Sequence, residues 1–164
     1  MTMPPGIALQ SGETLVHATA VECAGQCILL TGSSGAGKSD LALRLIGWPP
    51  TGLGLPPFSL VSDDQVLLTQ SGECVFARPP ETIAGRIEVR GLGLIALPYT
   101  GSAEVRLVIQ LSAAEAIERM PEAETVTLAG VVFPAVRLYP FEPSAPLKVA
   151  LALKAHLASR THRN

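Results

Sequence analysis

The chain has 164 residues, of which 48% are hydrophobic and 16% are charged, and its formal net charge at pH 7 is −2. This length is enough for one domain with a sizeable core, and the hydrophobic content excludes an intrinsically disordered chain. The low charge excludes a general basic surface for nucleic acid or for an anionic membrane. No apolar run reaches the roughly 18 to 20 residues of a spanning helix and the N-terminus lacks a signal-peptide pattern, so we expect a cytoplasmic protein.

The beginning of the chain predicts a hairpin behind a loose lead-in. We expect one domain over residues 1–164, in which residues 1–12 have no periodic pattern. Alternation over residues 14–21 predicts a strand that turns back into a second strand over residues 27–31. His17 lies in the first strand, where a lone histidine is more often structural than functional. The sequence alone does not place its side chain.

A phosphate-binding motif follows the second strand. The pattern G-x-x-x-x-G-K-[ST] is matched at every position by Gly32, Ser33, Ser34, Gly35, Ala36, Gly37, Lys38 and Ser39. The glycines allow a tight loop whose N–H groups converge on an anion. Lys38 would face the β and γ phosphates, and the Ser39 hydroxyl would complete the shell of a magnesium ion. The alternative is a Gly/Ser turn, but the strand before the motif and the helix predicted over residues 40–46 favour phosphate binding.

Two acidic residues follow a later strand. Residues 47–57 are too rich in Pro and Gly for a helix or strand and predict a surface loop. The strand over residues 58–62 then brings Asp63 and Asp64 to its C-terminal end, where ligands bind in α/β sheets. Both are candidates for metal contact and for a general base. A simple Asp-Asp turn is the alternative, and the phosphate loop upstream favours the functional interpretation.

The second half of the chain predicts more strands and two helices. Short strands over residues 65–69 and 74–77 predict a meander, and an extended segment over residues 87–95 puts Glu88 and Arg90 on one face. A cross-strand charge pair is the alternative for these two side chains. The remaining predicted elements are an apolar strand over residues 105–111, a brief helix begun by the capping pattern of residues 112–115 and ending near Pro121, a hairpin over residues 125–133, a strand over residues 135–138, and a closing helix capped by Ser144.

Several remaining residues have ordinary interpretations. Arg119 and Arg137 are solvated charges on sequence alone. The three cysteines, at positions 23, 27 and 74, cannot all pair, so reduced thiols are expected. No ligands with zinc-like spacing follow the first two of them, so we expect strand packing there instead of metal binding.

Four elements in this order resemble the HPr kinase/phosphorylase family. They are His17 twenty-one residues before Lys38, the phosphate loop, Asp63-Asp64 after a strand, and the stretch Glu88-Val89-Arg90-Gly91-Leu92-Gly93. The resemblance covers roughly residues 17–137 and is strongest to the short alphaproteobacterial form, which has the C-terminal catalytic domain only. It implies an α/β fold, namely a β-rich phosphate-loop domain similar to phosphoenolpyruvate carboxykinase, with a mixed sheet, a loop helix and a C-terminal helix.

The resemblance also implies an activity. Relatives use ATP and Mg²⁺ to phosphorylate a serine of HPr, the small phosphocarrier protein of the sugar phosphotransferase system. By that resemblance the loop and Lys38 hold the triphosphate, Ser39 and Glu88 bind Mg²⁺, and one acid of Asp63 and Asp64 takes the serine proton beside His17. Arg119 is the candidate for the arginine that neutralises charge on the transferred group. Longer relatives assemble as hexamers, so a homo-oligomer is expected.

Departures from the family limit this expectation. Longer relatives carry a Pro-Gly-Arg-Asn stretch tied to the reverse, phosphorolytic reaction, whereas residues 137–142 here read Arg-Leu-Tyr-Pro-Phe-Glu. The expectation therefore does not extend to phosphorylase activity. Two other functions stay open: a kinase for a small metabolite, which needs a closed pocket, and a nucleotide-sensing module without turnover. The set of Lys38, Asp63, Asp64 and Glu88 favours an enzyme over the sensing module.

Overall fold

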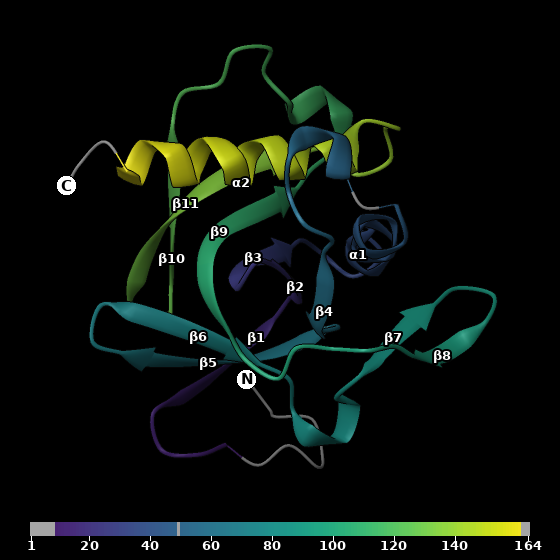
Figure 1. Ribbon diagram of the computed structural model, residues 1–164, viewed down its shortest axis with the longest axis vertical. Helices are drawn as coiled ribbons and strands as arrows, with labels where there is room; N and C mark the ends of the chain where they lie inside the picture. The colour runs from purple at the N-terminus through teal and green to yellow at the C-terminus, as the bar shows by residue number, and fades with distance from the viewer. Residues whose placement is uncertain (1–8, 49, 162–164) are drawn as a thin grey trace.

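The computed structural model describes residues 9–48 and 50–161, in which strands contribute more residues than helices do (Figure 1). The strands are β1 Glu13–His17, β2 Thr19–Cys23, β3 Gln26–Thr31, β4 Ser59–Ser62, β5 Gln65–Ser71, β6 Cys74–Arg78, β7 Arg86–Val89, β8 Gly93–Ala96, β9 Ala103–Leu111, β10 Glu124–Leu128 and β11 Val131–Leu138. The helices are α1 Lys38–Gly47 and α2 Ala145–Thr161. Single 3-10 turns cover Thr51–Leu53, Glu81–Ile83 and Ala114–Ala116.

Strand β9 is the centre of a curled, mixed sheet. The main path runs β1-β5-β6-β9-β3-β2-β4, and β11 joins β9 as a branch that also carries β10. Along its length β9 pairs antiparallel with β6 near its start, parallel with β3, and parallel with β11 near its end. The remaining strands, β7 and β8, form a separate two-stranded sheet that projects to one side (Figure 1).

The two faces of the sheet bury separate apolar clusters. Along β3, Ile28 and Leu30 belong to the cluster beneath the helices, whereas Cys27 and Leu29 belong to the cluster on the other face. Successive side chains of a strand point to opposite faces, so a strand covered on both sides reads as a continuous apolar run. Both helices lie over one face, and the loop that follows β3 leads into the N-terminus of α1 (Figure 1).

The N-terminal strand differs from the prediction. Residues 14–21 do not form one strand, because the chain leaves the hairpin at Ala18, whose N–H donates to the backbone oxygen of Asp64 at 3.1 Å. The part after this point, β2, pairs with β3 as the predicted hairpin, while β1 pairs with β5. Of the lead-in over residues 1–12, only residues 9–12 lie inside the described part.

Three later predictions were also wrong in detail. The capping pattern after β9 does not start an α-helix, because the Ser112 hydroxyl donates to the backbone oxygen of Gln110 at 3.2 Å, and only a 3-10 turn follows. The extended segment over residues 87–95 folds back on itself as the β7–β8 hairpin, in which Glu88 pairs with Leu94. The predicted strands after residue 130 are one continuous strand, β11.

Two further observations bear on the expectations from sequence. All three cysteines are free thiols, and burial raises the pKa of the Cys27 thiol well above its usual range. Among the described residues, no helix has the length and apolar content needed to cross a bilayer.

Candidate active site

The phosphate loop joins β3 to the N-terminus of α1, where the aligned peptide dipoles favour an anion. Gly35 and Gly37 have φ angles of 79° and 100°, which residues with side chains adopt rarely. A Cβ on Gly37 would also lie 2.9 Å from Cζ of Phe141. Glycine is therefore required at position 37 both by the backbone conformation and by this close approach.

The side chain of Lys38 is buried against the phosphate loop. Its Nζ donates to the backbone oxygens of Gly32 at 3.0 Å and Ser33 at 2.9 Å. An ammonium group has three N–H donors, so one remains for a ligand in this arrangement. The side chain is 6% exposed, which places a positive charge in the floor of the site.

Asp63 is the buried connection between three elements. Its Oδ1 accepts hydrogen bonds from the Thr19 hydroxyl at 2.9 Å and the Ser39 hydroxyl at 2.6 Å. Its Oδ2 accepts the backbone N–H of Glu88 at 2.9 Å. With an exposed fraction of 5%, this carboxylate fixes β2, α1 and β7 relative to one another and orients the hydroxyl of Ser39.

Asp64 points the other way although it is the next residue. Its backbone has φ of 66°, a left-handed conformation that Asp tolerates better than most residues. The turn is held by the N–H of Asp64, which donates to the Thr19 hydroxyl at 3.3 Å, and by its carbonyl oxygen, which accepts from Ala18. The side chain is 59% exposed and lines the pocket, so the turn separates the two acids into a buried one and an accessible one.

His17 lies next to the accessible acid. The β1–β5 register sets His17 opposite Gln65, immediately after the acidic turn. As a result its Nδ1 lies 3.4 Å from Oδ1 of Asp64, with the imidazole side chain 49% exposed. The family resemblance implied a place for His17 beside one of the two acids, and in the structure its neighbour is Asp64.

A pocket of about 360 Å³ opens above these groups. Its walls come from the phosphate loop, the first turns of α1, Asp64, the β7–β8 hairpin and Phe141. The predicted residues Lys38, Ser39 and Glu88 line it. Arg119 does not: it lies exposed in the segment that follows the 3-10 turn after β9, and its part in any transfer stays a prediction.

The oxygen groups at the pocket fit a magnesium ion whose remaining ligands come from phosphates and water. Among the described residues no three His, Cys, Asp or Glu side chains are grouped to hold a metal on their own. Mg²⁺ at phosphoryl-transfer sites commonly uses one or two protein oxygens and completes its shell with phosphate and water. The Ser39 hydroxyl, bonded to Asp63, and the Glu88 carboxylate at the pocket wall are such donors.

Sequence reasoning missed three residues around the site. Thr19 holds both acids, and its only signal is a polar side chain within a buried strand. Arg44 pairs with Asp40 and donates to the backbone oxygens of Pro140 and Glu142. The i,i+4 spacing in the sequence predicts the ion pair with Asp40 but not the two contacts to the distant backbone. Phe141 lines the pocket, and no local sequence pattern predicts this position.

Comparisons with known sequences agree with one another. The family model of the HPr Serine kinase C-terminal domain matches residues 9–143. The chain is 32% identical over 137 residues to an HPr kinase/phosphorylase of Enterococcus faecalis, and 31% identical over 143 residues to one of Streptococcus uberis. These matches cover 76% and 80% of this chain but 42% and 44% of the relatives. The chain therefore spans less than half the length of these two relatives.

A solved structure shows the same fold. The Hpr(Ser) kinase/phosphatase from Coxiella burnetii matches with a TM-score of 0.74 and 25% sequence identity, over 90% of this chain and 99% of that one. The α/β fold predicted from the sequence, with a mixed sheet, a loop helix and a C-terminal helix, is confirmed.

Proposed function

We propose, because the chain belongs to the family of the HPr serine kinase C-terminal domain, that it transfers the γ-phosphoryl group of ATP to a serine hydroxyl of an HPr-like phosphocarrier protein. The observation that carries the proposal is the accessible carboxylate of Asp64. It lines the same pocket as Lys38 and Ser39, and His17 stands behind it. A phosphate loop facing an accessible acid is the minimum that transfer to a hydroxyl requires.

The residues of the chain divide the work. The loop and Lys38 bind the triphosphate, while Ser39 and Glu88 hold Mg²⁺, which neutralises charge on the phosphates when bound. Asp63 positions the Ser39 hydroxyl and the backbone of Glu88. Most of the rate enhancement comes from this positioning and from charge neutralisation, because the protein has little covalent chemistry to perform in phosphoryl transfer.

Asp64 is the acid that we assign as the base. A seryl hydroxyl is a poor nucleophile at neutral pH, and a carboxylate within reach of it takes its proton during attack. Asp63 is not available for this step, because it is buried at 5% exposure, does not line the pocket, and is hydrogen-bonded to the protein through both oxygens. The Nδ1 of His17 lies 3.4 Å from the Asp64 carboxylate, close enough to position it. Arg119 would reach the site only if its segment moved toward the pocket, and we assign it no step.

The test is mass analysis of purified HPr after incubation with this protein, ATP and Mg²⁺. One added phosphoryl group on a serine is expected, and Lys38→Ala should not add it, because the γ-phosphate loses its cation. An HPr variant with alanine at the modified serine is the matched substrate control. If ATP binds but HPr gains no mass, the acceptor is wrong and a small-metabolite kinase or a sensing module replaces this proposal.

Two further properties follow from the proposed reaction. We propose the cytoplasm as the location of the protein, because the proposed reaction consumes ATP. By family resemblance we also propose a homo-oligomer, with a hexamer as the specific expectation. Light scattering on the purified chain checks this, since a hexamer has six times the mass of the 17.1 kDa chain.

A further inference from the structure

We infer that Phe141 is the platform on which the base of the bound nucleotide stacks. This inference rests on the proposed function, because it assigns the nucleoside end of the same pocket. Phe141 lies between β11 and α2, lines the pocket beside the phosphate loop, and is 55% exposed. A large aromatic side chain left this open at the edge of a ligand pocket has a face available for a flat partner.

The ring is held in place on its protein side. A Cβ on Gly37 would lie 2.9 Å from Cζ and 3.0 Å from Cε1 of Phe141, so the ring packs against the bare backbone of the phosphate loop. Tyr139 contacts it edge to face, with ring centroids 5.8 Å apart and planes at 75°. The exposure of Phe141 is therefore not a sign of a loose side chain.

The backbone around the ring is also anchored. Arg44 of α1 donates to the backbone oxygens on both sides of Phe141, those of Pro140 and Glu142. The Glu142 carboxylate in turn pairs with Lys148 of α2. A platform that is already fixed before the ligand arrives loses little conformational entropy on binding.

The other end of the pocket determines which part of the nucleotide meets the ring. The Ser39 hydroxyl faces Asp63, and the accessible Asp64 and the Glu88 side chain line the wall on that side. These groups take the metal and the γ-phosphate. The triphosphate then runs along the loop, and Phe141, which packs on Gly37, remains for the nucleoside.

A phenyl ring recognises a base by its π-face and offers no hydrogen bond to its edge. Every base has such a face, so stacking on a side chain tolerates different bases. We therefore expect Phe141 to contribute alike to the binding of ATP and of GTP, and to contribute nothing to a triphosphate that has no base.

The experiment compares the binding of MgATP and of magnesium tripolyphosphate by titration calorimetry. Phe141→Ala should lower the affinity for MgATP about five- to tenfold, which is the lower part of the range for one stacked base. It should leave the affinity for tripolyphosphate unchanged. In the same variant the affinity for MgGTP should fall by the same factor as the affinity for MgATP. Phe141→Trp should keep the affinity for MgATP, whereas Phe141→Leu, which preserves apolar bulk over Gly37, should behave as Phe141→Ala.

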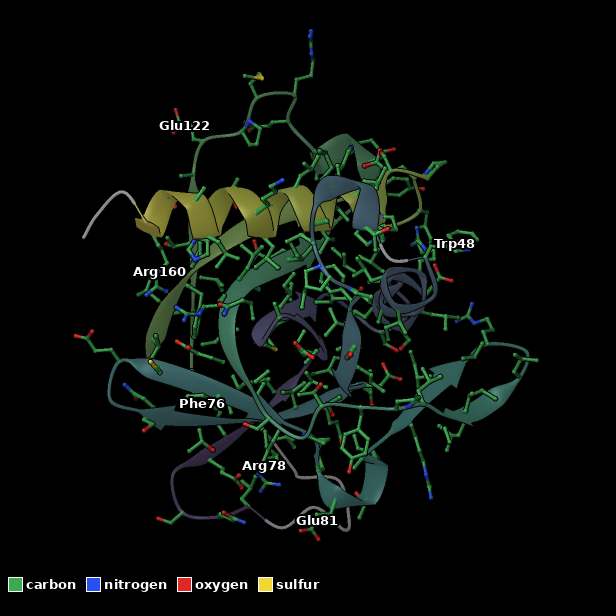
Figure 2. The ribbon with its side chains drawn as sticks, in the orientation of Figure 1. Trp48, Phe76, Arg78, Glu81, Glu122 and Arg160 are labelled. Atoms are coloured by element: carbon green, nitrogen blue, oxygen red, sulfur yellow. The ribbon has the colours of Figure 1, made fainter. Side chains whose placement is uncertain are left out.

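Phe76→Ala is the matched control. Phe76 is 38% exposed and lies on β6, away from α1, so its removal should change neither affinity (Figure 2). Equal weakening of both ligands by Phe141→Ala would overturn the inference, because the ring would then support the loop and not the base. Wild-type affinity of Phe141→Leu for MgATP would overturn it as well. If the wild-type chain binds neither ligand, the proposed function itself fails, and this result is distinct from the other two.

Discussion

The floor and the rim of the pocket are built differently. The floor consists of Lys38, Ser39 and Asp63, whose polar atoms are hydrogen-bonded to other parts of the protein. The rim includes Asp64 and Glu88, whose side chains are exposed. The geometry of the floor is thus set by the fold alone, whereas the rim keeps its functional atoms free for ligands.

This difference predicts which measurement responds to which substitution. A buried polar group that loses its partner costs about 1 to 3 kcal/mol of stability. An exposed group costs little stability, and its loss is felt in the reaction. Substitutions in the floor should therefore move the free energy of unfolding, and substitutions in the rim should move the rate of transfer.

Asp64→Asn should have the largest effect, and only on transfer. The amide cannot take the serine proton, and general base catalysis contributes about 10²- to 10⁴-fold, so we expect a loss of at least about 10²-fold. Asn tolerates a left-handed backbone as well as Asp, so the turn is kept. Single-turnover transfer to HPr measures the rate, and MgATP affinity and melting temperature should stay near wild type. A wild-type rate would show that Asp64 is not the base.

Asp63→Asn should break the floor. Its amide nitrogen cannot accept the hydrogen bonds that two carboxylate oxygens now accept from Thr19, Ser39 and Glu88. We expect the free energy of unfolding to fall by about 2 kcal/mol, with weaker MgATP binding. Urea unfolding measures this change, and Asp64→Asn is measured in the same way as the matched variant. Equal stability of the two variants would contradict the division into floor and rim.

His17→Gln should have a smaller effect on transfer than Asp64→Asn. The histidine does not touch the triphosphate pocket and acts through the Asp64 carboxylate. We expect about a tenfold lower rate, equivalent to about 1.4 kcal/mol, with unchanged MgATP affinity. The double variant with Asp64→Asn should be no slower than Asp64→Asn alone. Additive losses would show that His17 works independently of the acid.

Thr19→Val should lower stability without removing any group from the pocket. Its hydroxyl donates to Asp63 and accepts from the N–H of Asp64, and valine fills a similar volume without these bonds. We expect a loss of about 1 to 2 kcal/mol in urea unfolding. Thr19→Ser keeps the hydroxyl and serves as the control for it. A similar loss in both variants would assign the effect to packing of the methyl group.

Glu13→Gln tests the smallest effect, at a site outside both regions. Arg78 of β6 donates to the Glu13 carboxylate of β1, across the intervening strand β5, and lowers the pKa of that carboxyl. A lowered pKa stabilises the fold above the ordinary value of 4.5, and this contribution is lost as pH falls through the folded pKa. The free energy of unfolding of the wild type should exceed that of the variant by about 1 kcal/mol or less at pH 7, and this difference should disappear in acid. A constant difference between pH 7 and pH 3 would contradict this.

The sequence predicted two residues of the floor, Lys38 and Ser39, more readily than the rest of the site. The loop motif with its strand and helix is local, so Lys38 and Ser39 could be assigned from spacing alone. The roles of Asp63 and Asp64 could not be separated, because they depend on φ of 66° at one residue and on a hydroxyl forty-five positions earlier. Proximity of His17 to the acid depends on strand register, which a single sequence does not set.

Long-range contacts explain the other differences. Phe141 reaches the loop from 104 positions beyond Gly37, and nothing near it in the sequence signals a pocket. The helix predicted after Ser112 rested on a capping pattern, yet the hydroxyl bonds to the backbone of the preceding strand. Local patterns thus predicted most elements, and tertiary contacts decided where they ended.

The central position of β9 has a consequence for the order in which the protein folds. The phosphate-loop strand is bordered on one side by β2, which comes just before it, and on the other by β9, which is synthesised about eighty residues later. Pairings between segments this far apart in sequence form slowly, because a long loop must close first. On the ribosome the loop therefore emerges long before its neighbouring strand, and a nascent chain that ends at β8 carries the complete motif without the strand that borders it.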